Sequence, residues 1–286
     1  MKYMPGPGVY PTRIGGFNLV RKEDANISES CFEKPFVGLV VQGTKHSFMG
    51  GHEYQYTVNQ SIVAGVAMPV SSRVLNPTHE TPFLFMCLYL DRELLASLAF
   101  EMKDSFCRPY KPASGVSIAD ADADLCEMFL RLLELNEKPE QIAMRAPMML
   151  RELHYLLLAG PHGNLLRNLH TPGRQNNPVV QAIQWIRDNF KSPMRVEALA
   201  KYAGMSVASL HRHFKTFTGL SPLRYQKQLR LFEAQRLMVM ENQKASSAAF
   251  EVGYESLAQF NRDYKKLFGQ PPLRDLNRRR RGSSNL

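Results

Sequence analysis

The 286-residue sequence predicts an α+β multidomain protein, with strands and a helical hairpin in its N-terminal part and helices alone in its C-terminal part. Three observations predict this class. Short apolar runs separated by Gly, Pro and Asn come first, two amphipathic helical stripes follow, and a motif of about twenty residues then occurs twice, fifty positions apart. The patterns divide the chain into a small barrel (1–118), a helical hairpin (119–159), a linker (160–177), an all-α domain (178–276) and a basic tail (277–286).

The N-terminal part has the pattern of several short strands. Apolar runs at 37–41, 62–66 and 83–90 are each bounded by turn residues, and Gly50-Gly51 predicts a hairpin between two further strands. Tyr54 and Tyr56 fall on one face of the second of these strands, because strand side chains alternate. Strands at this spacing are typical of a small sandwich or barrel.

After residue 120 the apolar period becomes helical. One stripe runs through Leu125, Met128, Phe129, Leu132 and Leu133, Pro139 interrupts it, and a second stripe of similar length runs from Ile142 to Leu157. Two such helices are expected to pair as a hairpin. Their apolar stripes either complete the core of their own domain or meet a second subunit. Six Gly and Pro residues between 160 and 178 then indicate a linker.

The repeated motif predicts two helix-turn-helix units. Each copy has a short apolar segment, a glycine turn, and a serine that starts a second amphipathic segment. Ser221-Pro222 starts a long helix between the units, since Pro is tolerated in a first helical turn. The corresponding residues are Ser206, Leu210, Arg212, Phe214, Lys215, Gly219, Pro222, Leu223 and Arg224 in the first copy and Ser256, Phe260, Arg262, Tyr264, Lys265, Gly269, Pro272, Leu273 and Arg274 in the second.

Charge is concentrated in the half with the repeat. Residues 173–286 contain 20 Lys and Arg against 8 Asp and Glu, a net charge of +12, whereas residues 1–172 contain 16 against 18, a net charge of −2. Clustered cations of this kind favour a polyanionic partner, either nucleic acid or a membrane surface. No segment approaches the roughly 18 apolar residues of a spanning helix, and the N-terminus lacks the pattern of a signal peptide. We therefore expect a cytoplasmic protein that does not bind membranes.

The four cysteines indicate neither zinc nor disulfides. Cys31, Cys87, Cys107 and Cys126 are widely spaced, with no C-x-x-C pair and no histidine doublet beside them. Reduced thiols that are mostly buried are expected.

The second helix of each unit offers an open face for nucleic acid. Burial of Leu210, Phe214 and Phe217 in the first, and of Phe260 and Tyr264 with Leu267 or Phe268 in the second, leaves the other side free. We expect Arg212 and Arg262 to read bases, since guanidinium groups bind guanine bidentately. The expected base contacts are Ala208, His211, Arg212, Leu257, Ala258, Asn261 and Arg262, and the expected phosphate contacts are Ser206, Lys215, Ser256, Lys265 and Lys266.

For each cation taken alone, a solvated helix face is the simpler interpretation. Two arginines at equivalent places in two units argue against it here. The final arginine run, 278–281, is less specific and is typical of a disordered, solvated tail that adds nonspecific phosphate affinity.

Residues 178–276 closely resemble the DNA-binding domain of the AraC/XylS family of bacterial transcription regulators. The resemblance implies two helix-turn-helix units bridged by the long helix, with recognition helices in successive major grooves about 34 Å apart. The matching residues are Leu199, Ala200, Gly204, Met205, Ser206, Leu210, Arg212, Phe214, Lys215, Gly219, Ser221, Pro222, Tyr225, Arg230 and Ala234 in the first half, and Ala249, Val252, Gly253, Tyr254, Phe260, Arg262, Tyr264, Lys265, Gly269 and Pro272 in the second.

Two departures from the family pattern weaken the second unit. Ala245 and Ala248 stand where branched aliphatic residues are usual, and Leu257 and Ala258 provide no hydrogen bonds where polar contacts are frequent. The apolar side chains of Leu257 and Ala258 indicate either contact with thymine methyl groups or weak readout of sequence by that helix. We therefore expect the first unit to discriminate more strongly between sequences.

The N-terminal part resembles the cupin-like regulatory domain of the same family through the segments 41–45, 54–56 and 68–70. The resemblance implies a cupin-like β-barrel with a helical hairpin, a small-molecule effector, and a homodimer that binds double-stranded promoter DNA, with RNA polymerase as a candidate partner. Polar groups inside the barrel could bind the effector, although structural roles are the simpler interpretation. The candidates are Gln42, Lys45, His46, Tyr54 and Tyr56.

Two other classes of protein are weighed against a regulator with an effector. A metal-dependent cupin would need an H-x-H pair and a glutamate, whereas His46, His52, Glu53 and His79 lack that spacing, so we expect neither metal nor cofactor. No phosphate loop or nucleophile elbow occurs, and no catalytic residue is assigned. An architectural DNA-binding protein without effector is the other alternative.

Overall fold

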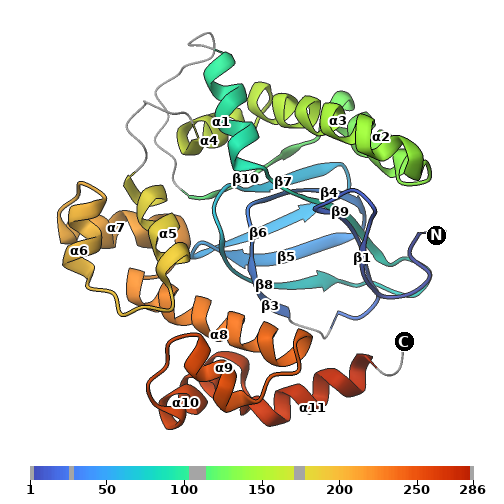
Figure 1. Ribbon diagram of the computed structural model, residues 1–286. Coiled ribbons are helices and arrows are strands. Elements are labelled where there is room, and N and C mark those ends of the chain that lie inside the picture. The colour runs from blue at the N-terminus through green and yellow to red at the C-terminus, as the bar shows by residue number, and fades with distance from the viewer. Residues whose placement is uncertain (1–2, 26–28, 103–113, 171–177, 284–286) are drawn as a thin grey trace.

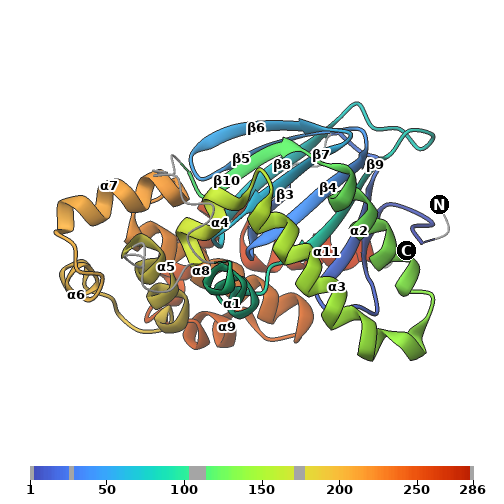
Figure 2. The same cartoon turned by 90° about the horizontal axis from the view of Figure 1, so that it is seen from above.

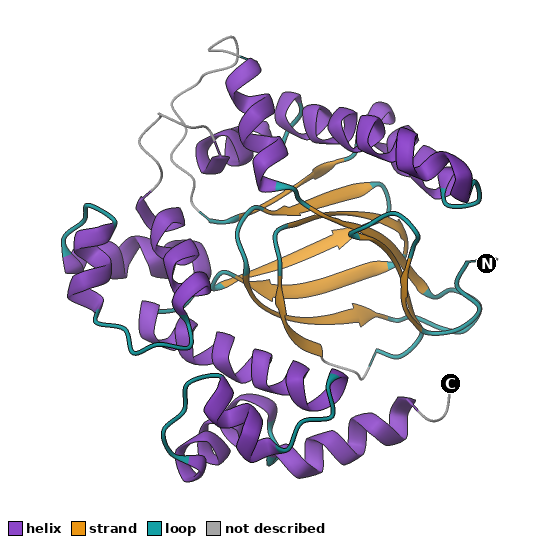
Figure 3. Ribbon diagram, viewed as in Figure 1, coloured by secondary structure: helices purple, strands orange, loops and turns teal. Residues whose placement is uncertain are grey.

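A computed structural model of the chain describes residues 3–25, 29–102, 114–170 and 178–283. Ten strands occupy its centre and eleven helices surround them within these ranges (Figure 1). Figure 3 shows that the strands gather in one block with helices on either side of it. The α+β class predicted from the sequence is confirmed.

The strands form two open antiparallel sheets. The larger sheet has the order β1 (Gly8–Pro11), β2 (Phe17–Lys22), β9 (Phe83–Tyr89), β4 (Phe36–Gln42), β7 (Gln60–Ala64) and β10 (Val116–Asp120). The smaller has the order β3 (Glu29–Glu33), β8 (Met68–Leu75), β5 (Thr44–Met49) and β6 (His52–Thr57).

The closed barrel expected from the sequence is therefore wrong for the described strands. β1 and β10 are the edges of one sheet, and β3 and β6 are the edges of the other. Strand spacing along the chain is the same for a sandwich and a barrel, so it does not determine whether the edges pair. The predicted hairpin is confirmed, because Gly50 and Gly51 join β5 to β6 with φ of 56° and 82°.

Four helices cover the larger sheet (Figure 1). They are α1 (Arg92–Glu101), α2 (Ala123–Leu135), α3 (Pro139–Ala159) and α4 (Gly163–His170). Asp122 caps α2 by accepting a hydrogen bond from the Leu125 amide, and Phe129 packs on Phe17 of β2 with ring centroids 6.1 Å apart. The apolar stripes of the predicted hairpin thus complete the core of their own domain.

Helix α4 lies within the predicted linker. Its apolar side, made by Leu165, Leu166 and Leu169, is buried, and the Leu169 side chain packs against Gly65, which directly follows β7. The Gly and Pro residues around it predict turns, but an eight-residue helix fits between them. The predicted linker is therefore helical from Gly163 to His170.

The C-terminal part is helical throughout. Its elements are α5 (Pro178–Asn189), α6 (Val196–Tyr202), α7 (Val207–Thr218), α8 (Pro222–Met240), α9 (Ala245–Glu251), α10 (Leu257–Phe268) and α11 (Pro272–Ser283). The long connecting helix predicted after Ser221 is α8. Helix α11 continues through residues 277–283, so the predicted tail begins as a helix.

The sheets and the first helix-turn-helix unit pack directly on each other. The Tyr225 hydroxyl of α8 donates a hydrogen bond to the Ala67 carbonyl at 2.9 Å, and the Tyr225 ring meets Phe32 of β3 edge-on at 5.1 Å. Gly219, which follows α7, lies against the main chain of Gly51, so close that an added Cβ would overlap the Gly51 nitrogen. Figure 2 shows α7 ending beside the end of β5 and β6.

Candidate nucleic-acid interface and ligand cavity

The two helix-turn-helix units have the same local geometry at both ends of their second helix. Ser206 and Ser256 cap α7 and α10 by accepting hydrogen bonds from the amides three residues later. Gly219 and Gly269 end these helices in the left-handed conformation, at φ of 72° and 79°. The sequence repeat therefore corresponds to a structural repeat.

Helix α7 buries one side and exposes the other. Leu210, Phe214 and Phe217 are buried, as predicted. Of the residues predicted to contact DNA from this unit, His211 is half-buried, and the exposed ones are Ser206, Ala208, Arg212 and Lys215.

Helix α10 has the same division. Phe260 and Tyr264 are fully buried, and Leu267 and Phe268 are half-buried against them. All residues of the second unit that were predicted to contact DNA are exposed, namely Ser256, Leu257, Ala258, Asn261, Arg262, Lys265 and Lys266.

The core of the second unit contains a polar cluster that was not predicted from the sequence. Asp275 of α11 is fully buried and accepts hydrogen bonds from the Tyr264 hydroxyl at 2.9 Å and from the Gln235 amide at 2.8 Å. A buried carboxylate is tolerated when its oxygens are hydrogen-bonded in this way. The cluster holds α8, α10 and α11 together beneath the exposed face of α10.

Both exposed faces belong to helices at the same end of the molecule. In Figure 1, α7 and α10 lie at the left, and α8 runs between their units. Because α8 contacts both α7 and α10, it sets the spacing of the two second helices.

A cavity of about 170 Å³ lies between the two sheets. Lys45 and Tyr56 from the predicted effector site line it, and Lys22, Glu33 and Asn18 add polar groups that were not predicted. The remaining lining residues are Val9, Val20, Cys31, Phe36, Met49, Val70, Ser72, Phe85, Cys87 and Tyr89.

The polar groups of the cavity have defined partners or environments. The Lys45 ammonium lies 5.6 Å from the centre of the Phe85 ring, a distance at which a cation is attracted to an aromatic face. The Tyr56 hydroxyl is 2.9 Å from Ser47 Oγ. Burial raises the pKa of the Cys87 thiol and raises the pKa of Tyr89 to about 12, so both groups are neutral near pH 7.

Three of the predicted effector residues do not line this cavity. The Gln42 amide donates to the Pro82 carbonyl at 2.8 Å, the Tyr54 hydroxyl donates to Ser114 Oγ at 3.0 Å, and His46 lies 3.6 Å from the Glu53 carboxylate. These side chains hold neighbouring segments together, which is the structural role weighed against binding.

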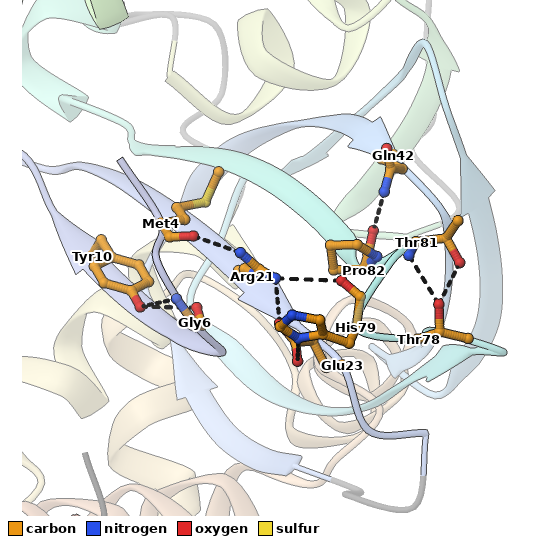
Figure 4. Close-up of polar contacts among 10 residues, drawn as sticks. All are labelled: Met4, Gly6, Tyr10, Arg21, Glu23, Gln42, Thr78, His79, Thr81 and Pro82. Carbon is orange, nitrogen blue, oxygen red and sulfur yellow. Dashed lines mark hydrogen bonds and ion pairs between the residues drawn. The ribbon is translucent and has the colours of Figure 1, made fainter. Parts of the chain in front are cut away.

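The remaining metal candidate, His79, belongs to a polar cluster near Gln42 (Figure 4). Its Nδ1 lies 2.9 Å from Glu23, which also pairs at 2.6 Å with the buried Arg21 guanidinium. The hydrogen bond with His79 and the charge of Arg21 lower the pKa of Glu23. Across the described parts of the chain, no three His, Cys, Asp or Glu side chains lie together as a metal site would require.

Among the described helices, none is both long and apolar enough to cross a bilayer.

Comparison with protein families gives two matches that together cover both parts of the chain. Residues 13–165 match the model described as the AraC-type transcriptional regulator N-terminus, and residues 199–278 match a helix-turn-helix domain. The first match ends within α4 and the second begins within α6.

Curated relatives are similar to a part of the chain. The HTH-type transcriptional activator RhaS of Escherichia fergusonii is 33% identical over 90 residues, which is 32% of either chain. RhaS of Salmonella newport is 30% identical over 118 residues, or 41% of this chain and 42% of that protein. The chain thus spans less than half the length of these relatives.

Solved structures are similar over nearly the whole chain. The crystal structure of an apo ToxT variant from Vibrio cholerae has a TM-score of 0.63 at 12% identity, covering 91% of this chain and 97% of that chain. Wild-type ToxT from the same organism, with an unsaturated fatty acid bound, has a TM-score of 0.59 at 11% identity and covers 91% and 93%. At these identities the likeness shows a shared fold.

Proposed function

The chain belongs to the AraC family of DNA-binding transcription regulators, which are not enzymes, and we propose that α7 and α10 enter successive major grooves on one face of promoter DNA. The observation that carries the proposal is the repeated geometry of a serine cap, a buried aromatic side and an exposed cationic side in both helices. Neither solubility nor core packing requires this repetition.

The side chains divide by chemistry into base readers and phosphate contacts. Arg212 and Arg262 are the proposed guanine readers, and Asn261 has the amide that pairs with adenine. His211, Ala208, Leu257 and Ala258 complete the base-facing set. The phosphate contacts are the lysines at 215, 265 and 266 together with the Ser206 and Ser256 hydroxyls, whose hydrogens remain available because the caps use only their oxygens.

Two substitutions test this division. Binding is measured by fluorescence anisotropy on a duplex selected from a random library with the full chain, and on a scrambled duplex of equal length. Arg212→Ala should reduce the preference between the two by about 1–3 kcal/mol, whereas Lys265→Ala should weaken both alike and lower the salt dependence. Equal losses on both duplexes for both variants would reject the assigned roles.

We propose further that the cavity between the sheets binds the effector. Two lysines and one glutamate on an otherwise mainly apolar wall favour a small anion with an apolar body, such as a carboxylate. ToxT, which shares the fold, has been crystallised with an unsaturated fatty acid. The volume of about 170 Å³ is below the roughly 300–1,000 Å³ of pockets for drug-sized ligands, which favours a short carboxylate.

Thermal shift of the full chain tests the cavity. A panel of short and long carboxylates is compared with the matching amides, because a ligand that binds the folded state raises the melting temperature. Lys45→Gln should abolish the response to the active carboxylate, and Lys138→Gln, at an exposed site before α3, should keep it. A response that survives Lys45→Gln, or that amides produce equally, would place the effector elsewhere. No response to any member would favour an architectural DNA-binding protein.

Strand β3 gives the effector cavity a direct route to the DNA-binding part. Cys31 and Glu33 line the cavity, and Phe32 between them points to the opposite side and contacts the rings of Tyr225 and Phe232 in α8. Tyr225 also meets Phe214 of α7 at 5.3 Å. A ligand that displaces β3 would therefore change the support of the first recognition helix.

Tyr225→Phe tests this coupling, since it keeps the ring and removes the bond to the Ala67 carbonyl. We expect DNA binding without effector to remain and the change in affinity on adding effector to shrink. An unchanged effector response would exclude Tyr225 from the coupling.

The outer face of the helical hairpin is the proposed homodimer surface. Leu130 of α2 and Met144, Met148 and Tyr155 of α3 are large apolar side chains that are 51%, 75%, 61% and 44% exposed. Sedimentation velocity of a Met144→Glu, Met148→Glu variant should then show a shift from dimer to monomer, and an unchanged sedimentation coefficient would contradict this assignment. We propose a bacterial cytoplasmic setting, in which RNA polymerase is a candidate partner.

A further inference from the structure

The linker helix α8 has cations that the assignment to recognition helices leaves unused. A groove of about 490 Å³ lies between α8 and α10. Residues 224, 227, 228 and 231 of α8 form one wall, at the spacing of a single helix face, and residues 263, 266 and 267 of α10 form the other. The groove therefore joins the two helix-turn-helix units on one side.

The groove is strongly cationic. Arg224, Lys227 and Lys266 face a single carboxylate, that of Asp263. Lys227 Nζ lies 3.1 Å from Asp263 Oδ2, which also accepts a 3.4 Å hydrogen bond from the Tyr254 hydroxyl. Arg224 and Lys266 are exposed and pair with no carboxylate within the parts of the chain that the structure describes. The net charge of the lining favours an anion.

A side-chain amide inside the groove also lacks a partner. Gln228 Oε1 is buried without a hydrogen bond in the described structure. Gln228 lines the groove, and with its oxygen buried its NH₂ group is the part of the amide that can donate to an anion there. The polar groups of the groove therefore do not all bond to one another, in contrast to those of the cluster around Asp275.

The position of the groove indicates which kind of anion it binds. Arg224 and Lys227 belong to the first two turns of α8, which begins at Pro222 directly after the first unit, and Lys266 belongs to the second recognition helix. A duplex that bridges α7 and α10 must cross the interval between them, which α8 spans (Figure 1). A phosphodiester backbone has the charge and the continuity for such a site.

We propose that this groove binds the DNA backbone between the two major-groove segments, with Arg224, Lys227 and Lys266 on phosphates and Gln228 as an additional donor. Helix α8 is then a third DNA-contacting element besides α7 and α10. The proposal rests on the proposed docking of α7 and α10. Asp263 opposes phosphate binding and holds Lys227 in place when DNA is absent.

The experiment measures the salt dependence of binding to the selected and scrambled duplexes with the full chain. Arg224→Gln and Lys227→Gln should each weaken both duplexes by the same factor and lower the slope of log K against log salt by about 0.9 per lost contact. Asp263→Asn should act in the opposite direction and strengthen binding to both. Lys227→Arg preserves the charge and should preserve the slope.

The matched control is Arg236→Gln on the same helix. It removes the same charge, but Arg236 pairs with Glu233 and Glu241 outside the groove, and its loss should leave the slope unchanged. A wild-type slope in the Arg224→Gln, Lys227→Gln double variant would overturn the groove proposal and leave the recognition helices intact. A lower slope in Lys227→Arg would also overturn it, because the effect would then be structural. Absence of duplex binding by the wild-type chain would instead overturn the proposed function.

Discussion

Two of the three histidines that are buried in the described structure, His162 and His170, should make the protein sensitive to acid. His162 is 1% exposed, with Nε2 2.8 Å from Ser61 Oγ and Nδ1 2.9 Å from Ser117 Oγ, and burial lowers its pKa to about 4. His170 at the end of α4 is 8% exposed, and burial together with the charge of Arg92 lowers its pKa to about 4 as well. Both side chains are therefore neutral in the folded protein above about pH 4.

The direction of the effect follows from proton binding. In the unfolded chain a histidine has a pKa of about 6.5, so between pH 6.5 and pH 4 the unfolded state binds protons that the folded state does not. The free energy of unfolding should therefore fall as the pH falls through this window, by about 1.4 kcal/mol per unit for each histidine, and level off below about pH 4. At about pH 5.5 the two histidines together would cost about 3 kcal/mol.

Urea unfolding followed by circular dichroism between about pH 7 and pH 4.5 measures this slope. His162→Asn removes one titrating group, so its slope below about pH 6 should be shallower than that of the wild type by about 1.4 kcal/mol per unit, whatever its stability at pH 7. Asn168→Ala, at an exposed site of α4, the helix that begins directly after His162, is the control and should keep the wild-type slope. Identical slopes in the wild type and His162→Asn would refute the account of a buried neutral histidine.

Three further predictions concern packing and caps. Phe129→Ala should lower the free energy of unfolding by about 3–5 kcal/mol, because the fully buried ring packs on Phe17; a loss under about 1 kcal/mol in urea unfolding would show that the hairpin does not seal the sheet. Ser256→Ala should cost about 1 kcal/mol through the lost cap of α10, and Ser256→Thr should recover most of it in the same assay. Gly219→Ala and Gly269→Ala should each lower the free energy of unfolding by about 1–2 kcal/mol, because both place a Cβ in the left-handed region, but only the Cβ at 219 would also meet Gly51. Limited proteolysis should therefore cut Gly219→Ala faster than the wild type and cut Gly269→Ala at nearly the wild-type rate. Equal rates for the two variants would show that the contact between Gly219 and Gly51 does not hold the two parts together.

The C-terminal domain was predicted from the sequence in most of its detail. Serine caps, glycine ends and the buried aromatic positions are local features, and α7 and α10 each have a strong apolar period. Leu210, Phe214 and Phe260 were therefore assigned correctly to the core. The buried cluster around Asp275 was not predicted, because its three members come from helices whose packing the local pattern does not specify.

The N-terminal domain was predicted less completely. The apolar strands β4, β7 and β9 were found, whereas β1, β2, β3, β8 and β10 were not, since they are shorter or less uniformly apolar and all but β1 pair with a strand that is distant in the chain. Lys45 and Tyr56 of the cavity lie on the predicted hairpin strands, but Lys22 and Glu33 lie on strands that only tertiary pairing reveals. The cavity was therefore predicted only in part, because local patterns do not show which strands distant in the chain lie side by side.

The contact between Gly219 and Gly51 constrains how such regulators can be recombined. Two main chains touch there without side chains between them, and each glycine comes from a different half of the protein. An engineered hybrid that joined this N-terminal half to the C-terminal half of a relative would keep Gly51 but lose Gly219. Unless the new partner also has a residue without a Cβ at that place, the two halves of the hybrid could not pack on each other as they do in this protein.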